Sequence, residues 1–166
     1  MADNAIDVYL NDHLAGAMLG TDLADQIQSE SGGTALGELM ASLAPEIEQD
    51  RQTLIELMQQ LDSSKNPVKQ ATAWVAEKAS RAKFKGLTSG EPELGTFMAL
   101  ETLVLGVRGK ACMWIALRQV ADQHPAIASM NFDELIARAR AQEDALEHAR
   151  LVASTRALAN PIHATG

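Results

Sequence analysis

The chain has 166 residues, enough for one domain with a proper apolar core, and its formal net charge of -8 disfavours binding to phosphate backbones and anionic membranes. Hydrophobic residues make up 46% of the chain but aromatic residues only 4%, and the excess consists of Ala, Leu and Met, which favour helices over strands. The composition therefore predicts an all-α protein whose partners are neither nucleic acid nor a membrane.

The first predicted helix covers residues 5–29, where apolar residues recur at helical spacing. The Ser-Gly-Gly sequence at 31–33 then ends the pattern. Within this helix Gly16 and Gly20 lie four residues apart. Because glycine is costly in a helix interior, we expect a neighbouring helix to pack closely against them.

The second predicted helix covers residues 34–61, with Thr34 as its N-cap. Pro45 lies inside this segment, where proline lacks the N–H that would bond to the preceding turn. The sequence therefore predicts either a kink or a restart of the helix at Pro45, next to Glu46 and Asp50.

A shorter helix is predicted over residues 67–84, in the connection between the second and the third long helix. We expect Trp74, Glu77, Lys78 and Arg81 to fasten this helix to the bundle. In that arrangement Trp74 is buried, and Glu77 is paired to a cation.

The third long helix is predicted over residues 92–123, between Pro92 and Pro125, and it is apolar on nearly every face. Such a helix is buried on most sides, so we interpret it as the central helix of a bundle. Cys112 lies within it and is the only cysteine of the chain, which excludes an intramolecular disulfide. We expect a buried, inert thiol.

Glu101 shares one stripe of this third helix with apolar neighbours, because residues at helical spacing lie on the same face. Those neighbours are Leu94, Phe97, Met98, Leu105 and Cys112. An unpaired buried carboxylate is costly, so we expect Glu101 to be both buried and paired. Its expected nearest partner is His13, Asp50 or Arg108, and pairing with a cation would lower its pKa.

The last long helix is predicted over residues 131–158, because Asn131 and Glu134 have the spacing of a capping box. Its inward stripe passes through Gln142 or Glu143, and residues 159–166 are expected to form a loose tail. One domain, 1–158, thus holds four long helices, with about 30 residues between the second and the third. This connectivity predicts a ferritin-like, up-and-down four-helix bundle with a short fifth helix in its crossover.

Each long helix carries at least one ionisable residue in its apolar stripe. Ferritin-like metal bundles bring carboxylates and histidines together from all four helices, because hard cations need several converging oxygen and imidazole donors. Glu46 and Asp50 lie four residues apart, as do Glu143 and Glu147, so each pair shares a helix face and could chelate one ion. The candidate ligands are His13, Glu46, Asp50, Glu101, Glu143 and Glu147, and the metal would be iron or manganese.

Two alternatives to an active di-iron site stay open. A di-iron site needs Glu-x-x-His on two helices, and the sequence has none, so the candidates could form a non-standard metal site instead. They could equally form an internal ion-pair network. In that case the cations are Arg51, Lys78, Arg81, Arg108 and Lys110.

Four segments, at residues 10–17, 46–54, 77–83 and 100–110, resemble a group of uncharacterised bacterial ferritin-like proteins. The resemblance spans most of the chain and implies the ferritin-like bundle. Membership of the wider ferritin-like superfamily implies iron or manganese carboxylate chemistry only where the Glu-x-x-His ligand motif is intact. In this chain that motif is not intact.

The sequence as a whole favours a non-enzymatic structural, stress-associated or interaction protein with a buried network of carboxylate, histidine and arginine side chains. A metal-binding oxidoreductase is the alternative. The acidic N-terminus lacks the features of a secretory signal, and no apolar run reaches the length of a membrane span, so a cytoplasmic location is expected. The expected partner is a second copy of the chain or another protein.

Overall fold

The computed structural model describes residues 5–61 and 90–159 of the chain. Four long α-helices make up most of these residues: α1 (Ala5–Glu30), α2 (Ala35–Gln60), α4 (Pro92–Val120) and α5 (Phe132–Leu158). A short 3-10 helix, η2 (Ala121–Gln123), follows α4 directly. There is no strand within the two described ranges, which confirms the prediction of an all-α bundle.

The ends of the helices follow local signals in the sequence. The Thr34 hydroxyl accepts a hydrogen bond from the Gly37 N–H at 3.2 Å, and the Asn131 side chain accepts one from the Glu134 N–H at 3.2 Å. Each cap satisfies a donor that the first turn of a helix leaves without an intrahelical partner. α2 continues through Pro45 as one helix, so of the two predicted alternatives, a kink or a restart, the restart is wrong.

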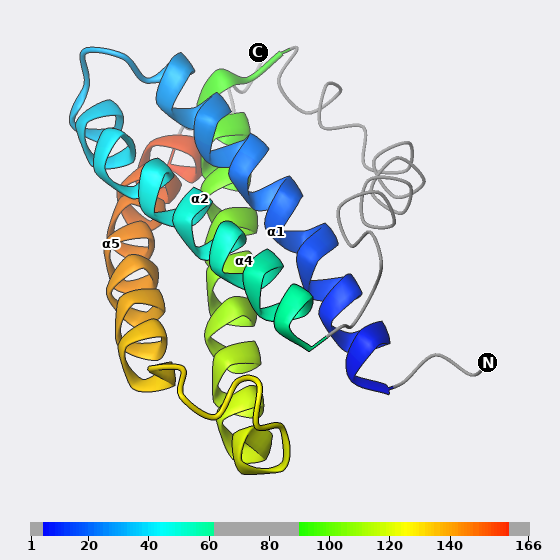
Figure 1. The fold of residues 1–166 in the computed structure, drawn as a ribbon. Coiled ribbons are helices and arrows are strands. Elements are labelled where there is room, and N and C mark those ends of the chain that lie inside the picture. Colours follow the sequence, from blue (N-terminus) through cyan, green and yellow to red (C-terminus); the bar gives the residue numbers. More distant parts are fainter. Residues whose placement is uncertain (1–4, 62–89, 160–166) are drawn as a thin grey trace, which may run out of the picture.

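Two helical hairpins form the bundle. In Figure 1 α1 runs antiparallel to α2 and α4 runs antiparallel to α5, whereas α2 and α4 run in the same direction. α1 packs mainly on α2, α4 packs mainly on α5, and α1 also contacts α4. The end of α2 and the start of α4 therefore lie at opposite ends of the bundle.

Some predictions fall outside the described residues. The helix expected over residues 67–84 is one of them, together with the expected contacts of Trp74, Glu77, Lys78 and Arg81. The tail expected over residues 159–166 is described only at Ala159.

The apolar core is divided into two clusters along the bundle axis. The first lies at one end and includes Leu10, Leu14, Leu54, Met58, Trp114, Leu117, Phe132 and Ile136. The second lies toward the other end and includes Ala24, Ile27, Met40, Ile47, Leu100, Leu103, Val107 and Leu146. Between the clusters lie Asp50, Lys110, Arg138 and Gln142, which we call the middle layer.

α4 presents a different face to the core from the one predicted. Its buried residues include Leu100, Leu103, Val104, Val107, Met113, Trp114 and Leu117. Leu105 is 60% exposed and the Cys112 thiol is exposed, so their predicted burial is wrong. The helix is apolar on nearly all sides, and its packing against α5 and α1 decides which face is buried.

The close approach predicted at Gly16 and Gly20 is not seen among the described residues. A Cβ atom built on either residue would have no atom of another described element within 4 Å. Close approach occurs instead at Gly37, where a Cβ atom would lie 2.2 Å from the Ser31 carbonyl oxygen. Gly37 therefore lets the turn between α1 and α2 pass close to the start of α2.

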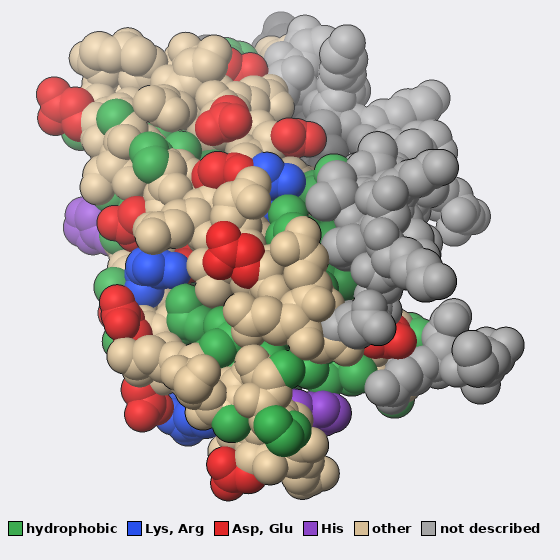
Figure 2. Space-filling model, viewed as in Figure 1, with side chains coloured by type: hydrophobic (Ala, Val, Ile, Leu, Met, Phe, Trp, Pro, Cys, Tyr) green, Lys and Arg blue, Asp and Glu red, His purple; other side chains and the backbone are tan. Residues whose placement is uncertain are grey.

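The described surface is mainly acidic. Figure 2 shows Asp and Glu side chains spread across one face of the molecule, with few Lys and Arg side chains between them. In the ranges 5–61 and 90–159, no helix combines the length and the apolar character that a membrane span requires.

Candidate functional site

Asp50 is the buried centre of the middle layer. Its position on α2, between Ile47 and Leu54, directs it toward the interior, and its side chain is only 1% exposed. Lys110 from α4 donates to Oδ2 of Asp50 at 2.5 Å, and Arg138 from α5 donates to Oδ1 through Nε at 2.8 Å and also through Nη2. One carboxylate from α2 thus holds a cation from each of two other helices.

Gln142 completes the layer. Its side chain is buried and accepts a hydrogen bond from Lys110 at 2.5 Å. Its amide nitrogen lies 3.1 Å from a carboxylate oxygen of Glu46 and 3.2 Å from Oδ2 of Asp50, and it donates to both. The buried polar atoms of Asp50 and Gln142 are therefore paired within the protein, as buried polar groups generally must be.

The formal charges of this group balance. Asp50 and Glu46 carry two negative charges, and Lys110 and Arg138 carry two positive ones. Burial lowers the pKa of Lys110 because it disfavours the charged ammonium, and the Asp50 carboxylate offsets part of that effect. Counted together with Glu46, which accepts a hydrogen bond from Gln142, the middle layer has no surplus charge that would attract an ion.

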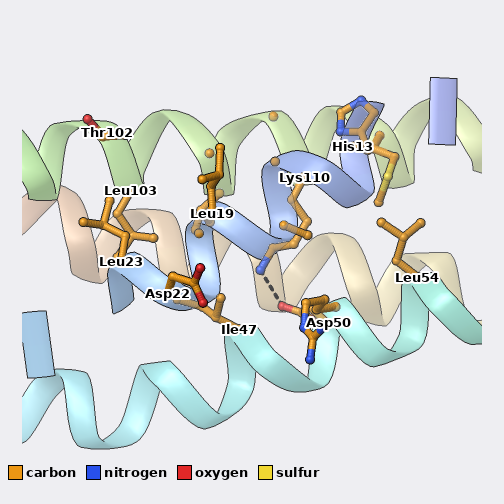
Figure 3. A pocket seen from close by; sticks show the side chains of 18 of the residues that line it. His13, Leu19, Asp22, Leu23, Ile47, Asp50, Leu54, Thr102, Leu103 and Lys110 are labelled. Carbon is orange, nitrogen blue, oxygen red and sulfur yellow. Dashed lines mark hydrogen bonds and ion pairs between the residues drawn. The ribbon is translucent and has the colours of Figure 1, made fainter. Parts of the chain in front are cut away.

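A cavity of about 420 Å³ borders the middle layer, between α1, α2 and α4. It lies where α1 contributes Gly16 and Gly20 and α4 contributes Gly106 and Gly109, none of which has a side chain to fill the space. Leu19, Leu23, Ile47 and Leu103 supply apolar walls toward one end (Figure 3).

Figure 3 shows His13, Lys110 and Asp50 toward the other end, but Asp22 lies beside Leu23 and Ile47, so polar groups occur at both ends of the cavity. His13 is half-buried and packs edge-on against the Tyr9 ring, with ring centres 4.6 Å apart. Burial lowers the pKa of His13 from its ordinary value of 6.5, so the imidazole is neutral at pH 7. The indole of Trp114 also lines this part of the cavity and is fully buried.

The predicted burial of Glu101 is wrong. Its side chain is 48% exposed and pairs with Arg150 of α5 at 3.0 Å, not with His13, Asp50 or Arg108. Arg150 also binds Glu147 at 2.6 Å, on the same outer face of α4 and α5. Glu101 belongs to that surface because the face of α4 that carries Leu105 and Cys112 points away from the core.

The six candidate ligands do not converge on one point. Arg108 donates to Glu143 at 2.6 Å, and Glu147 is bound by Arg150, so neither carboxylate faces the middle layer. Among the residues that the structure describes, no group of three or more His, Cys, Asp or Glu side chains could hold a metal ion. Of the six, the structure places Asp50 and His13 on the cavity and Glu46 beside Gln142.

Two members of the middle layer were not predicted as site residues. Arg138 lies three residues after Leu135 and four before Gln142, so helical spacing alone places it beside the inward stripe of α5. The sequence left Gln142 and Glu143 as alternatives for that stripe, and Gln142 is the buried one. A buried Asp50 needs cationic partners, and this requirement could have identified Arg138 as one of them.

Comparisons of the chain with protein-family models, with curated proteins and with solved structures find no match.

Proposed function

We propose that the protein is a ferritin-like four-helix bundle with one long crossover, and that it acts by binding, as a structural or interaction protein, rather than by metal-dependent oxidation. The parallel direction of α2 and α4 supports the crossover, because a bundle with this order needs one long connection between its two hairpins (Figure 1).

The observation that carries the proposal is the pairing of the acidic candidates with cationic side chains. Asp50 binds Lys110 and Arg138 within the interior. On the outer face, arginines of α4 and α5 bind the carboxylates of Glu101, Glu143 and Glu147. A metal ion would have to displace these cations, whose positive charge repels it, before it could gain carboxylate ligands.

Metal analysis and an oxidase assay test this proposal. Protein purified without chelator is loaded with Fe²⁺ or Mn²⁺, passed over a desalting column and analysed by mass spectrometry, in parallel with Asp50→Asn. We expect well under one metal ion per chain in both proteins, and no consumption of oxygen by the iron-loaded sample. A stoichiometric metal that the Asp50→Asn or Glu101→Ala variant loses would overturn the proposal in favour of a metal-binding oxidoreductase.

A further inference from the structure

The sequence between α2 and α4 is the basic part of an acidic chain. Residues 62–89 contain six of the 14 Lys and Arg residues but only two of the 22 Asp and Glu residues. This segment is therefore positively charged, whereas the chain as a whole has a formal net charge of -8. Opposite charges attract, so an acidic surface of the bundle is the natural place for the segment to dock.

α1 provides such a surface. Among the four long helices that the structure describes, it is the one that contains no Lys or Arg. Asp12 and Asp22 of α1 line the cavity beside the middle layer, and Asp25 is exposed on the same helix. α1 thus offers carboxylates along most of its length.

The two cations that line the cavity do not cancel this charge, because each is held by another carboxylate. Arg51 donates to Glu48 at 2.7 Å, and Lys110 donates to Asp50 at 2.5 Å. The carboxylates that α1 contributes therefore leave the lining negative.

The helix ends that residues 62–89 connect lie at the two ends of α1. α2 ends beside the start of α1, since Leu61 and Ile6 both pack on the first apolar cluster. α4 begins beside the end of α1, since Thr96 and Glu30 line one surface hollow. The path between these points is about as long as α1, roughly 39 Å for its 26 residues, and residues 62–89 would cover about 42 Å even as a continuous helix.

The cavity is the open space along that path. α1 packs mainly on α2, whereas α1 and α4 leave a cavity of about 420 Å³ between them. Its lining on α1 extends from Asp12 to Gln26, about 21 Å along the helix. Glycines of α1 and α4 face it with no described atom within 4 Å of an added Cβ, so its walls leave room for another stretch of backbone.

From these observations we propose that residues 62–89 of the same chain dock in the cavity between α1 and α4 and run in the direction of α1, with basic side chains toward its carboxylates. This assignment rests on the single crossover of the proposed function, and it names the surface to which the crossover binds. The occupant of the cavity is then the protein's own chain and not a small molecule.

A carbodiimide, which joins a lysine amine directly to a carboxylate in contact with it, tests both the surface and the direction. In the full-length protein we expect Lys69 to be joined to Asp12 and Lys83 to Asp22 or Asp25, as identified by mass spectrometry of the digested product. Lysines of residues 62–89 joined mainly to α5, or joined to α1 in the reverse order, would overturn the proposal.

Isotope labelling tests whether the occupant belongs to the same chain. Unlabelled and nitrogen-15-labelled proteins are mixed, unfolded and refolded together before the carbodiimide is added. We expect both peptides of each cross-link to carry the same label. Cross-links between a labelled and an unlabelled peptide would show that a second copy supplies the segment, which would overturn the assignment to the same chain.

Limited digestion with trypsin tests the cavity itself, because residues 62–89 are rich in trypsin sites. Gly106→Leu places a side chain in the cavity, so cleavage within 62–89 should become about tenfold faster or more, as expected when the docked state is destabilised. The variant should fold, since Gly106 is exposed in α4 and leucine favours a helix.

Ala116→Leu is the matched control, since Ala116 is exposed on the same helix and lies outside the cavity lining. Its cleavage rate should equal that of the unaltered protein. Equal rates in Gly106→Leu and the unaltered protein would overturn the docking of residues 62–89 in this cavity. None of these results affects the metal measurements above, so the two proposals can fail separately.

Discussion

Removal of the Asp50 carboxylate should destabilise the protein more than any other single change in the middle layer. Asp50→Ala leaves Lys110 and Arg138, whose side chains are 14% and 22% exposed, facing each other without their shared anion. Breaking a buried ion pair by removing one partner costs about 3–5 kcal/mol. Since a domain of this kind is stable by about 5–15 kcal/mol, the variant should still fold at 25 °C but with a much smaller margin.

Urea unfolding at pH 7, followed by far-ultraviolet circular dichroism, measures this loss. With a denaturant dependence of about 2 kcal/mol per molar urea, the midpoint should fall by about 2 M. The control is Glu56→Ala, which removes an exposed carboxylate from the same helix and should leave the midpoint nearly unchanged.

A triple variant separates the stability lost when one partner is removed from the net contribution of the intact ion pairs to stability. Asp50→Leu combined with Lys110→Met and Arg138→Met removes all three charges and fills the layer with apolar side chains, which is often neutral or even stabilising. We expect it to regain most of the stability lost in Asp50→Ala. A loss below about 1 kcal/mol in Asp50→Ala, or a triple variant no more stable than the single one, would refute the reasoning.

Three further predictions concern other parts of the bundle. In an NMR titration the His13 imidazole should lose its proton with a midpoint below pH 6.5, because burial lowers its pKa. Its contribution to stability should be present above pH 6.5 and decline as the pH falls through the lowered pKa, and a titration midpoint at or above pH 6.5 would contradict this prediction. Glu101→Gln should leave the urea midpoint unchanged within error, because Glu101 and Arg150 pair on an exposed face, and a large decrease would show that this carboxylate has a structural role. Gly37→Ala should cost about 1–3 kcal/mol in the same assay, because its Cβ meets the Ser31 carbonyl oxygen, whereas a stable variant would show that the turn can move away.

The helices and their ends could be predicted because the signals are local. Thr34 and Asn131 lie directly before the helices they cap, and their side chains bond within three residues. The apolar stripes of α1 and α2 also have polar residues on the opposite side, so the buried face is unambiguous. Asp50 was correctly predicted on the inward stripe for that reason, and it is buried.

The orientation of α4 could not be predicted in the same way. When nearly every position of a helix is apolar, several stripes fit the helical period equally well. The choice of the stripe that holds Glu101 and Leu105 placed the carboxylate inside, although both residues are exposed. The face that contacts α5 depends on the shape of a helix distant in the sequence, and no local pattern records it.

The position of the middle layer between two apolar clusters fixes the helices in register. A slide of α2 along α4 by one helical turn, about 5.4 Å, would carry Asp50 from the level of Lys110 to that of Val107 or Trp114. Both of these residues belong to the apolar clusters, so the carboxylate would lose its cations while it stayed buried. Leucines and alanines along the helices would tolerate such a slide far better, because one apolar contact replaces another. The charged layer therefore makes one alignment of the bundle much more favourable than its neighbours, much as a polar residue in the seam of a coiled coil selects a single register.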